Sequence, residues 1–201
     1  MTTVFNLCAL CLLCALCVKW IFLRMQNLIE SIKSAIVDVH DFPKPGIVYK
    51  DITPIFQDAE LSNRILDALV DQYKDKNLEG VAGLESRGFL FGMPLALRLG
   101  VPFILIRKKN KLPRERFSVN YDLEYGQNVI EMHMDAVKPG QRILIHDDVL
   151  ATGGTASAAA KLIQQAQGEI AGFSFLITLS FLKGEDVLSN YCNDIHTFAR
   201  F

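Results

Sequence analysis

The chain has 201 residues, of which 50% are hydrophobic, and a formal net charge of -1 at pH 7. This length and apolar content suffice for one globular domain with a sizeable core, and the near-neutral balance gives no electrostatic signature of nucleic-acid binding. Only one of the five cysteines, Cys192, lies beyond residue 17, so the body of the chain has no disulfide framework and is expected to be cytoplasmic.

The first 24 residues are strongly apolar. Only Asn6 interrupts the apolar run from Val4 to Val18, which resumes after Lys19 as Trp20–Leu23. This pattern is compatible with a membrane anchor or an export signal, although no positive residues precede it. A metal site on the Cys-x-x-Cys spacing is disfavoured, because these cysteines are embedded in leucine and alanine rather than in polar loops.

Met25 opens an ordinary amphipathic helical pattern and provides an alternative start. We favour this reading, in which residues 1–24 are an upstream extension and residues 25–201 form the domain. Membrane association is then expected only if residues 1–24 are retained.

From Met25 onward, helical and strand patterns alternate. Helices are predicted at Met25–Val37, at Leu61–Lys74, from Gly88 to Leu99, and at Thr155–Gln167; strands are predicted at Gly80–Leu84, Val101–Ile106, Asn128–Met134, Arg142–Ile145 and Phe173–Leu179. Strands separated by helices imply an α/β fold with a parallel sheet covered on both faces. Because ligands bind beyond the carboxyl ends of such strands, the loops after Leu84, Ile106, Ile145 and Leu179 should share one crevice.

The span Leu112–Gly126 is long and polar and interrupts this alternation. Few of its residues could anchor a core, and connections of this length are usually lids or disordered. We therefore expect a flexible lid that closes over the substrates and excludes water.

The stretch RILIHDDVLATGGTASAAAKLI, residues 142–163, joins a buried strand to an alanine-rich helix. Gly153 and Gly154 allow a tight turn, so that successive N–H groups and the helix N-terminus face one point and form an anion site. Carboxylates so close to a phosphate would repel it, unless a ribose lies between them and donates hydrogen bonds from its hydroxyls to the carboxylates. The predicted ribose 5-phosphate site comprises Asp147, Asp148, Ala151, Thr152, Gly153, Gly154 and Thr155.

HDDVLATGGTA resembles the phosphoribosyl-pyrophosphate loop of type I phosphoribosyltransferases. From about Met25 to the end, the chain resembles the adenine phosphoribosyltransferase family, with further matching segments DFPKPGIVYKDITP, GLESRGFLFG, LIRKKNKLP and YDLEYG in family order. The resemblance implies a mostly parallel central sheet flanked by helices, with a small N-terminal hood and a lid loop. It also implies a homodimer that converts adenine and phosphoribosyl pyrophosphate into AMP and pyrophosphate, with Mg²⁺ held by the substrate and water rather than by the protein.

The resemblance assigns roles to further residues. Arg87 and Glu124 would be catalytic, Glu124 by managing the proton at adenine N7, whereas Lys109 is expected to be only solvated. The pyrophosphate would be bound by Ser86, Arg87, Arg107, Lys108 and Lys111, and adenine by Val48, Tyr49, Lys50 and Leu179. Asn120, Thr178 and Glu185 depart from the family pattern, so contacts beside them are not carried over.

Two alternatives compete with this function. Another 6-substituted purine could be the base, although the hypoxanthine–guanine relatives carry an acidic residue where this chain has Ala151. A non-catalytic sensor of the ribosyl donor is disfavoured because Arg87, the Lys/Arg cluster and Glu124 are all present.

Overall fold

The computed structural model describes the backbone of residues 4–122 and 127–201, and the side chains of residues 19–20, 22–121 and 128–201. The predicted catalytic residue Glu124 lies outside the described residues. The chain divides into two compact units, Met1–Ala68 and Leu69–Phe201, which are described separately.

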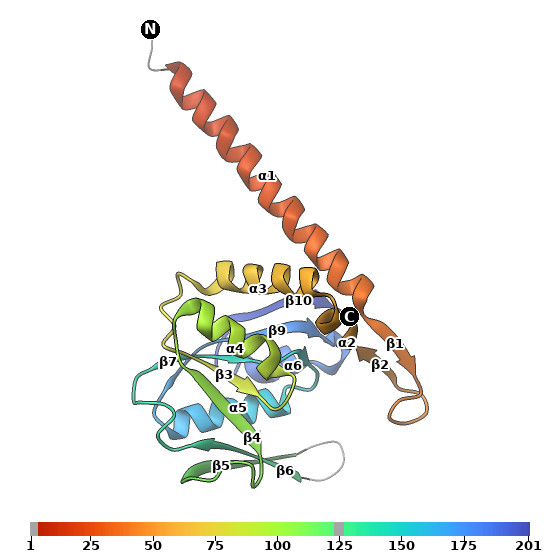
Figure 1. The fold of residues 1–201 in the computed structure, drawn as a ribbon, viewed down its shortest axis with the longest axis vertical. Coiled ribbons are helices and arrows are strands. Elements are labelled where there is room, and N and C mark those ends of the chain that lie inside the picture. Colours follow the sequence, from red (N-terminus) through yellow and green to blue (C-terminus); the bar gives the residue numbers. More distant parts are fainter. Residues whose placement is uncertain (1–3, 123–126) are drawn as a thin grey trace. The chain divides into compact units, whose positions relative to one another are not determined.

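The first unit combines a long helix with a small hairpin. Helix α1 runs without interruption from Val4 to Ala35 (Figure 1). It therefore includes the helix predicted from Met25, which ends at Ala35 rather than Val37. Strands β1 (Val37–His40) and β2 (Val48–Asp51) pair antiparallel, and are followed by α2 (Thr53–Gln57) and the first part of α3 (Ala59–Tyr73). Among the residues with described side chains, no helix combines the length and apolarity that a membrane crossing requires.

The second unit is built on an eight-stranded sheet in the order β10-β9-β7-β3-β4-β6-β5, with β8 paired to β9. The strands are β3 (Gly80–Leu84), β4 (Phe103–Lys108), β5 (Arg116–Asp122), β6 (Gln127–His133), β7 (Arg142–His146), β8 (Val149–Leu150), β9 (Glu169–Thr178) and β10 (Ile195–Arg200). The strands from β10 to β4 are parallel, whereas β6 runs antiparallel to both β4 and β5.

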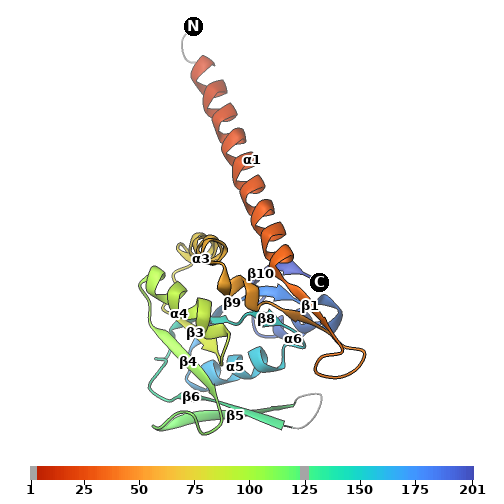
Figure 2. The same cartoon turned by 45° about the vertical axis from the view of Figure 1, so that its right-hand side comes forward.

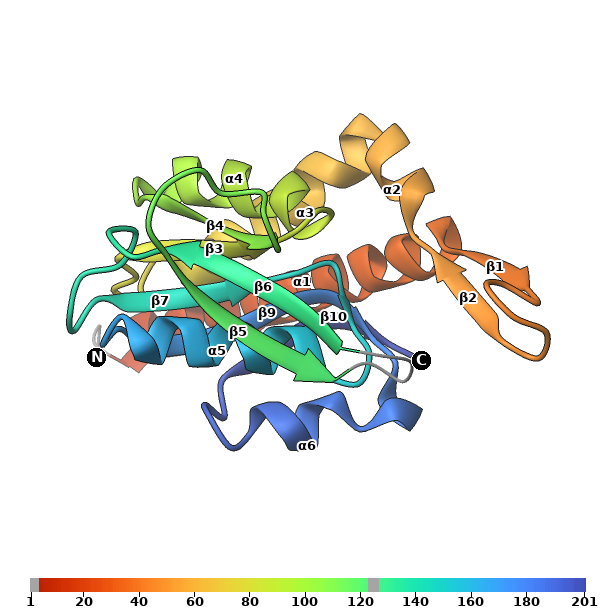
Figure 3. The same ribbon diagram turned by 90° about the horizontal axis from the view of Figure 1, so that it is seen from below.

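Helices cover both faces of this sheet, as the alternating pattern predicted. Helix α4 (Gly88–Leu99) lies on one face, and α5 (Gly154–Gln165) and α6 (Gly184–Leu188) lie on the other (Figure 3). A short 3-10 helix, η1 (Ser180–Leu182), precedes α6. The predicted architecture, a mostly parallel central sheet flanked by helices, is thereby confirmed.

The core forms where apolar strands meet the small side chains of α5. Ile143, Ile145 and Phe173 are fully buried, and so are Ala159 and Ala160 on the helix. Alanine allows the helix to pack close to the sheet, and each large apolar side chain buried there contributes roughly 1.5–3 kcal/mol. This packing fixes the ends of β7 and α5, between which the predicted phosphate loop lies.

The prediction of a lid without regular structure over residues 112–126 is wrong for residues 116–122. Residues 116–122 of the predicted lid form strand β5, which pairs with β6 along its whole length; Phe117, Val119 and Tyr121 alternate with polar residues, and Val119 is buried. Strands β5 and β6 form an antiparallel edge next to β4, within a sheet that is otherwise parallel as expected (Figure 2). Strand β4 accordingly extends to Lys108, since β6 supplies partners for Arg107 and Lys108.

Candidate active site

The carboxyl ends of four parallel strands meet at one edge of the sheet. Leu84 is paired with Ile106, Gly83 with His146, and His146 with Ser174. The prediction that the loops after β3, β4, β7 and β9 share this edge is confirmed. The predicted phosphate loop, Asp147, Asp148 and Arg87 all follow these strand ends.

The loop between β8 and α5 has the geometry of an anion site. Gly153 is left-handed, with φ +81°, and α5 begins at Gly154 without a capping side chain among the described residues. The first N–H groups of α5 are therefore available to a ligand. The loop borders a cavity of about 70 Å³, whose lining includes Asp147, Ala151, Thr152, Gly153, Gly154 and Thr155.

The two adjacent aspartates differ in environment. Asp148 is buried and its carboxylate forms an ion pair with Arg87. Asp147 borders the cavity, and its Oδ1 accepts a hydrogen bond of 2.9 Å from the N–H of Asp148. Burial, and then the neighbouring Asp148 carboxylate, raise the pKa of Asp147 well above its ordinary value, although Arg87 opposes this shift. The structure thus brings the predicted Asp147, Asp148 and Arg87 together.

Close backbone approach at Gly88 makes this arrangement possible. Ser86 and Arg87 lie in the turn between β3 and α4, where the Glu85–Ser86 peptide bond is cis. A Cβ atom at Gly88 would lie 2.7 Å from the carbonyl oxygen of His146 and 3.0 Å from Oδ1 of Asp147. Only glycine therefore lets the start of α4 lie against the aspartates.

The cationic cluster after β4 is organised by a carboxylate that sequence reasoning missed. Glu85 accepts hydrogen bonds from Arg107 Nε at 3.1 Å and from the Lys108 N–H at 2.9 Å. Burial alone would raise the pKa of Glu85, but these two donors outweigh burial and lower it. Arg107 is thus already paired, whereas the side chains of Lys108 and Lys111 are exposed. An acidic residue directly after a buried strand was the available sequence signal for Glu85.

Comparisons with known proteins match most of the chain. Residues 49–195 match the phosphoribosyl transferase domain family. Over 174 residues the chain is 53% identical to adenine phosphoribosyltransferase from Cytophaga hutchinsonii, covering 87% of this chain and 96% of the relative. The chain belongs to the adenine phosphoribosyltransferase family.

Solved structures of the adenine phosphoribosyltransferase family share the fold. The enzyme from Rhodothermus marinus superposes with a TM-score of 0.81 at 45% identity, covering 88% of this chain and 99% of that chain. The enzyme from Saccharomyces cerevisiae, solved with an imino-altritol bisphosphate and adenine, gives a TM-score of 0.80 at 37% identity, covering 86% and 99%.

The residues predicted from the family to bind adenine fall in both units. In the first unit, Val48, Tyr49 and Lys50 lie on β2, where the Tyr49 ring packs edge-on against Phe42 and Lys50 pairs with Asp38 at 2.6 Å. In the second unit, Leu179 is half-buried, and its N–H bonds to the Leu150 carbonyl at 2.9 Å.

The three departures from the family pattern lie in different surroundings. Glu185 pairs with Arg200 at 3.0 Å on the surface, and Asn120 lies exposed on β5 opposite Val129. Thr178 is buried, and its hydroxyl has no hydrogen-bond partner among the described residues.

Gly184 is a second contributor that sequence reasoning missed. A Cβ atom there would overlap the carbonyl oxygen of Ala151, and one at Gly153 would lie 2.9 Å from the carbonyl oxygen of Gly184. The start of α6 therefore packs directly against the backbone of the phosphate loop. No local pattern at Gly184 indicated this, because the contact joins segments about 30 residues apart in the chain.

Proposed function

We propose that this chain transfers the 5-phosphoribosyl group from phosphoribosyl pyrophosphate to adenine, giving AMP and pyrophosphate in purine salvage. The observation that carries the proposal is the cavity formed by the phosphate loop beside Asp147, in a chain of the adenine phosphoribosyltransferase family. The uncapped start of α5 would bind the 5-phosphate. The carboxylates would accept hydrogen bonds from the ribose hydroxyls.

The reaction breaks the bond between the anomeric carbon and a pyrophosphate oxygen and forms one from that carbon to adenine N9. Positive charge develops on the sugar as the bond to the leaving group weakens, as in glycoside hydrolysis. The carboxylates of Asp147 and Asp148 would stabilise that charge, and cations at Arg87, Lys108 and Lys111 would stabilise the departing pyrophosphate. Glu124, which lies outside the described residues, would handle the proton at N7.

The side chains around the phosphate loop fit a Mg²⁺ ion that enters bound to the substrate. Among the described residues, no group of three or more His, Cys, Asp or Glu side chains is placed to hold a metal ion. Mg²⁺ typically keeps several waters and binds through substrate phosphates, so we expect the substrate and water to hold it. When bound, it would offset the charge of the leaving group.

A homodimer is the proposed assembly. Leu90, Met93 and Leu97 lie three and four residues apart on α4 and are 51%, 43% and 68% exposed, and Leu105 on β4 is also exposed. Such an apolar stripe on a helix face is typical of a surface that another chain covers. Leu97→Glu is expected to shift the mass measured by light scattering from dimer to monomer.

A base-panel assay tests the function. Purified protein with Mg²⁺ and the ribosyl donor should consume adenine and form AMP, and should leave hypoxanthine and guanine unchanged. Turnover of another 6-substituted purine instead of adenine would change the assigned base. Binding of the donor without turnover of any base would favour the sensor. Because the ribosyl donor is a cytoplasmic metabolite, we place the activity in the cytoplasm.

A further inference from the structure

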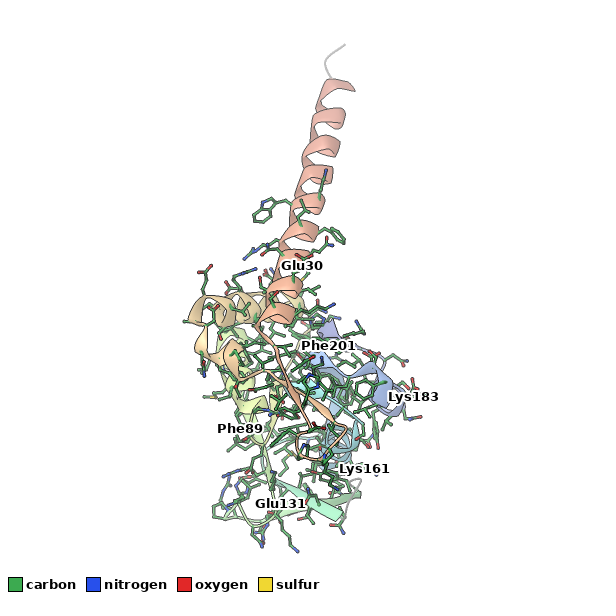
Figure 4. The ribbon with its side chains drawn as sticks, turned by 90° about the vertical axis from the view of Figure 1, so that its right-hand side faces the viewer. Glu30, Phe89, Glu131, Lys161, Lys183 and Phe201 are labelled. Atoms are coloured by element: carbon green, nitrogen blue, oxygen red, sulfur yellow. The ribbon has the colours of Figure 1, made fainter. Side chains whose placement is uncertain are left out.

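A buried acid lies away from the phosphate loop. Among the residues that the structure describes, only Glu131 and Asp148 are acidic and buried, and Glu131 is 2% exposed. Asp148 belongs to the site already described. Glu131 lies on β6, the middle strand of the antiparallel edge, opposite Arg107 of β4 and Ser118 of β5 (Figure 4).

The Glu131 carboxylate has two partners among the described residues. Its Oε2 accepts a hydrogen bond of 3.0 Å from the N–H of Asn110 and forms an ion pair with Arg116 Nε at 3.0 Å. Arg116 in turn donates to the Leu112 carbonyl at 3.3 Å. A buried carboxylate is unfavourable unless it is paired and hydrogen-bonded. The contact of Glu131 with Asn110, in the turn that follows β4, therefore indicates a specific role for this residue.

Glu131 completes a set of hydrogen bonds to three consecutive N–H groups. The N–H of Lys108 bonds to Glu85 Oε2 at 2.9 Å, that of Lys109 to the Val129 carbonyl at 3.1 Å, and that of Asn110 to Glu131 at 3.0 Å. Asn110 is left-handed, with φ +64°, and turns the chain away from β4. The backbone of this turn is therefore held at successive residues while the side chains of Lys108, Lys109 and Lys111 remain exposed.

We propose that Glu131 is a positioning residue that holds the cationic turn Lys108–Lys111 in the conformation that binds the pyrophosphate group. The proposal rests on the proposed function, in which this turn meets the leaving group. Several ammonium groups bind one polyanion tightly only if the backbone that carries them is already ordered, because ordering it on binding would weaken the affinity. Glu131 acts through the turn and makes no contact with substrate.

Glu131→Gln tests the proposal in the full chain. This substitution keeps the shape of the side chain but removes its negative charge. That charge pairs with Arg116 and strengthens the hydrogen bond from the Asn110 N–H. The dissociation constants of pyrophosphate and AMP are measured by calorimetry, together with kcat and the KM for both substrates. We expect pyrophosphate affinity to fall and donor KM to rise by about tenfold, as for a lost charged hydrogen bond. AMP affinity and adenine KM should change by less than ~2-fold, since their groups lie at the phosphate loop and base site.

Asp135→Asn is the matched control. Asp135 follows β6 and pairs with Arg114, but both side chains are more than 60% exposed. Removing this pair should leave all four constants unchanged, because exposed ion pairs contribute little. Unchanged pyrophosphate affinity in folded Glu131→Gln, or equal loss of pyrophosphate and AMP affinity, would overturn the proposal.

Amide hydrogen exchange in the unmodified protein tests the same point without a variant. The N–H groups of Lys108, Lys109 and Asn110 should exchange more slowly than that of Lys111, and free exchange at all three would contradict the role of Glu131. A wild-type protein that binds neither pyrophosphate nor the ribosyl donor would instead overturn the proposed function. The two failures are therefore distinguishable.

Discussion

At the scale of single residues, Asp147 and Asp148 face opposite electrostatic conditions although they are adjacent. Asp148 has an arginine partner, whereas Asp147 is half-buried beside a like charge and its pKa is raised. When a carboxyl pKa is higher in the folded than in the unfolded state, folding is favoured at low pH. That contribution is lost as the pH rises from the unfolded pKa, about 3.8, through the raised folded value. Ionised Asp147 thus opposes folding at neutral pH, as expected for a residue kept for function.

Asp147→Asn should therefore stabilise the ligand-free protein at neutral pH while impairing it as an enzyme. We expect Tm to rise by roughly 2–4 °C for each kcal/mol gained, and kcat/KM for the ribosyl donor to fall by about 100-fold or more. Scanning calorimetry and AMP formation measure the two effects. Asp75→Asn, at an exposed position, should change neither. Lower stability combined with full activity would contradict both assignments for Asp147.

The burial of His146 predicts a second, separate pH dependence of the free energy of unfolding. It is fully buried, its Nδ1 lies 3.2 Å from the Ser174 hydroxyl, and burial above all lowers its pKa from 6.5 to about 4. The unfolded chain therefore takes up a proton before the folded chain does. The contribution to stability is fully present above pH 6.5, is lost as the pH falls towards 4, and amounts to on the order of 3 kcal/mol.

The measurement is urea unfolding at pH 7 and pH 4.5. The wild-type protein should lose more unfolding free energy between these pH values than His146→Val, with a difference of about 2 kcal/mol. Both proteins share every other titrating group, so the difference isolates His146. If the unfolding free energies of the two proteins changed equally with pH, the neutral, buried state of His146 would not contribute to the pH dependence of stability.

At the scale of elements, the phosphate loop depends on contacts from a neighbouring element. The turn is left-handed at Gly153, and the start of α6 packs against it through Gly184. The loop sequence alone allows the turn, since glycine tolerates this conformation. The position of α6 then prevents the loop from relaxing, because neither glycine has room for a Cβ atom.

Gly153→Ala should therefore weaken AMP binding by at least about tenfold and destabilise the protein by about 1–3 kcal/mol. Gly140→Ala is a close control, because Gly140 has φ +79° but no atom within 4 Å of an added Cβ. Gly140→Ala should lower the free energy of unfolding by a similar amount, because its backbone is also left-handed, but it should retain normal AMP affinity. Calorimetric titration with AMP and urea unfolding measure the two effects. Equal AMP affinities in the two variants would refute the role of the Gly153–Gly184 contact.

At the scale of the whole molecule, helix α1 changes character along its length. Trp20, Phe22 and Leu23 are exposed, with Arg24 stacked over the Trp20 ring at 5.7 Å, whereas Leu28 and Ile32 are buried. Arg64 of α3 donates to Asn27 at 2.7 Å. Described contacts to the rest of the first unit therefore begin after Met25.

A protein starting at Met25 should fold and retain the full kcat/KM. None of the residues proposed for the active site lies within residues 1–24, and their removal eliminates an apolar segment that would otherwise associate with membranes or aggregate. Fractionation and AMP formation, compared with the full chain, provide the measurement. Loss of folding or of activity on truncation would show that the extension belongs to the domain.

The sequence by itself determined the parts of this protein that depend on local pattern. Apolar strand runs, helical spacing and the Thr-Gly-Gly-Thr turn predicted the parallel strand ends and the phosphate loop, because these features are encoded within a few consecutive residues. Only the tertiary structure decided the partners of charged groups: Arg87 with Asp148, Arg107 with Glu85, and Arg116 with Glu131. It also decided that residues 116–122 form a strand, since their alternation is stable only when β6 and the core cover one face. Such pairings join residues distant in the chain, and their energies depend on burial that no local pattern encodes.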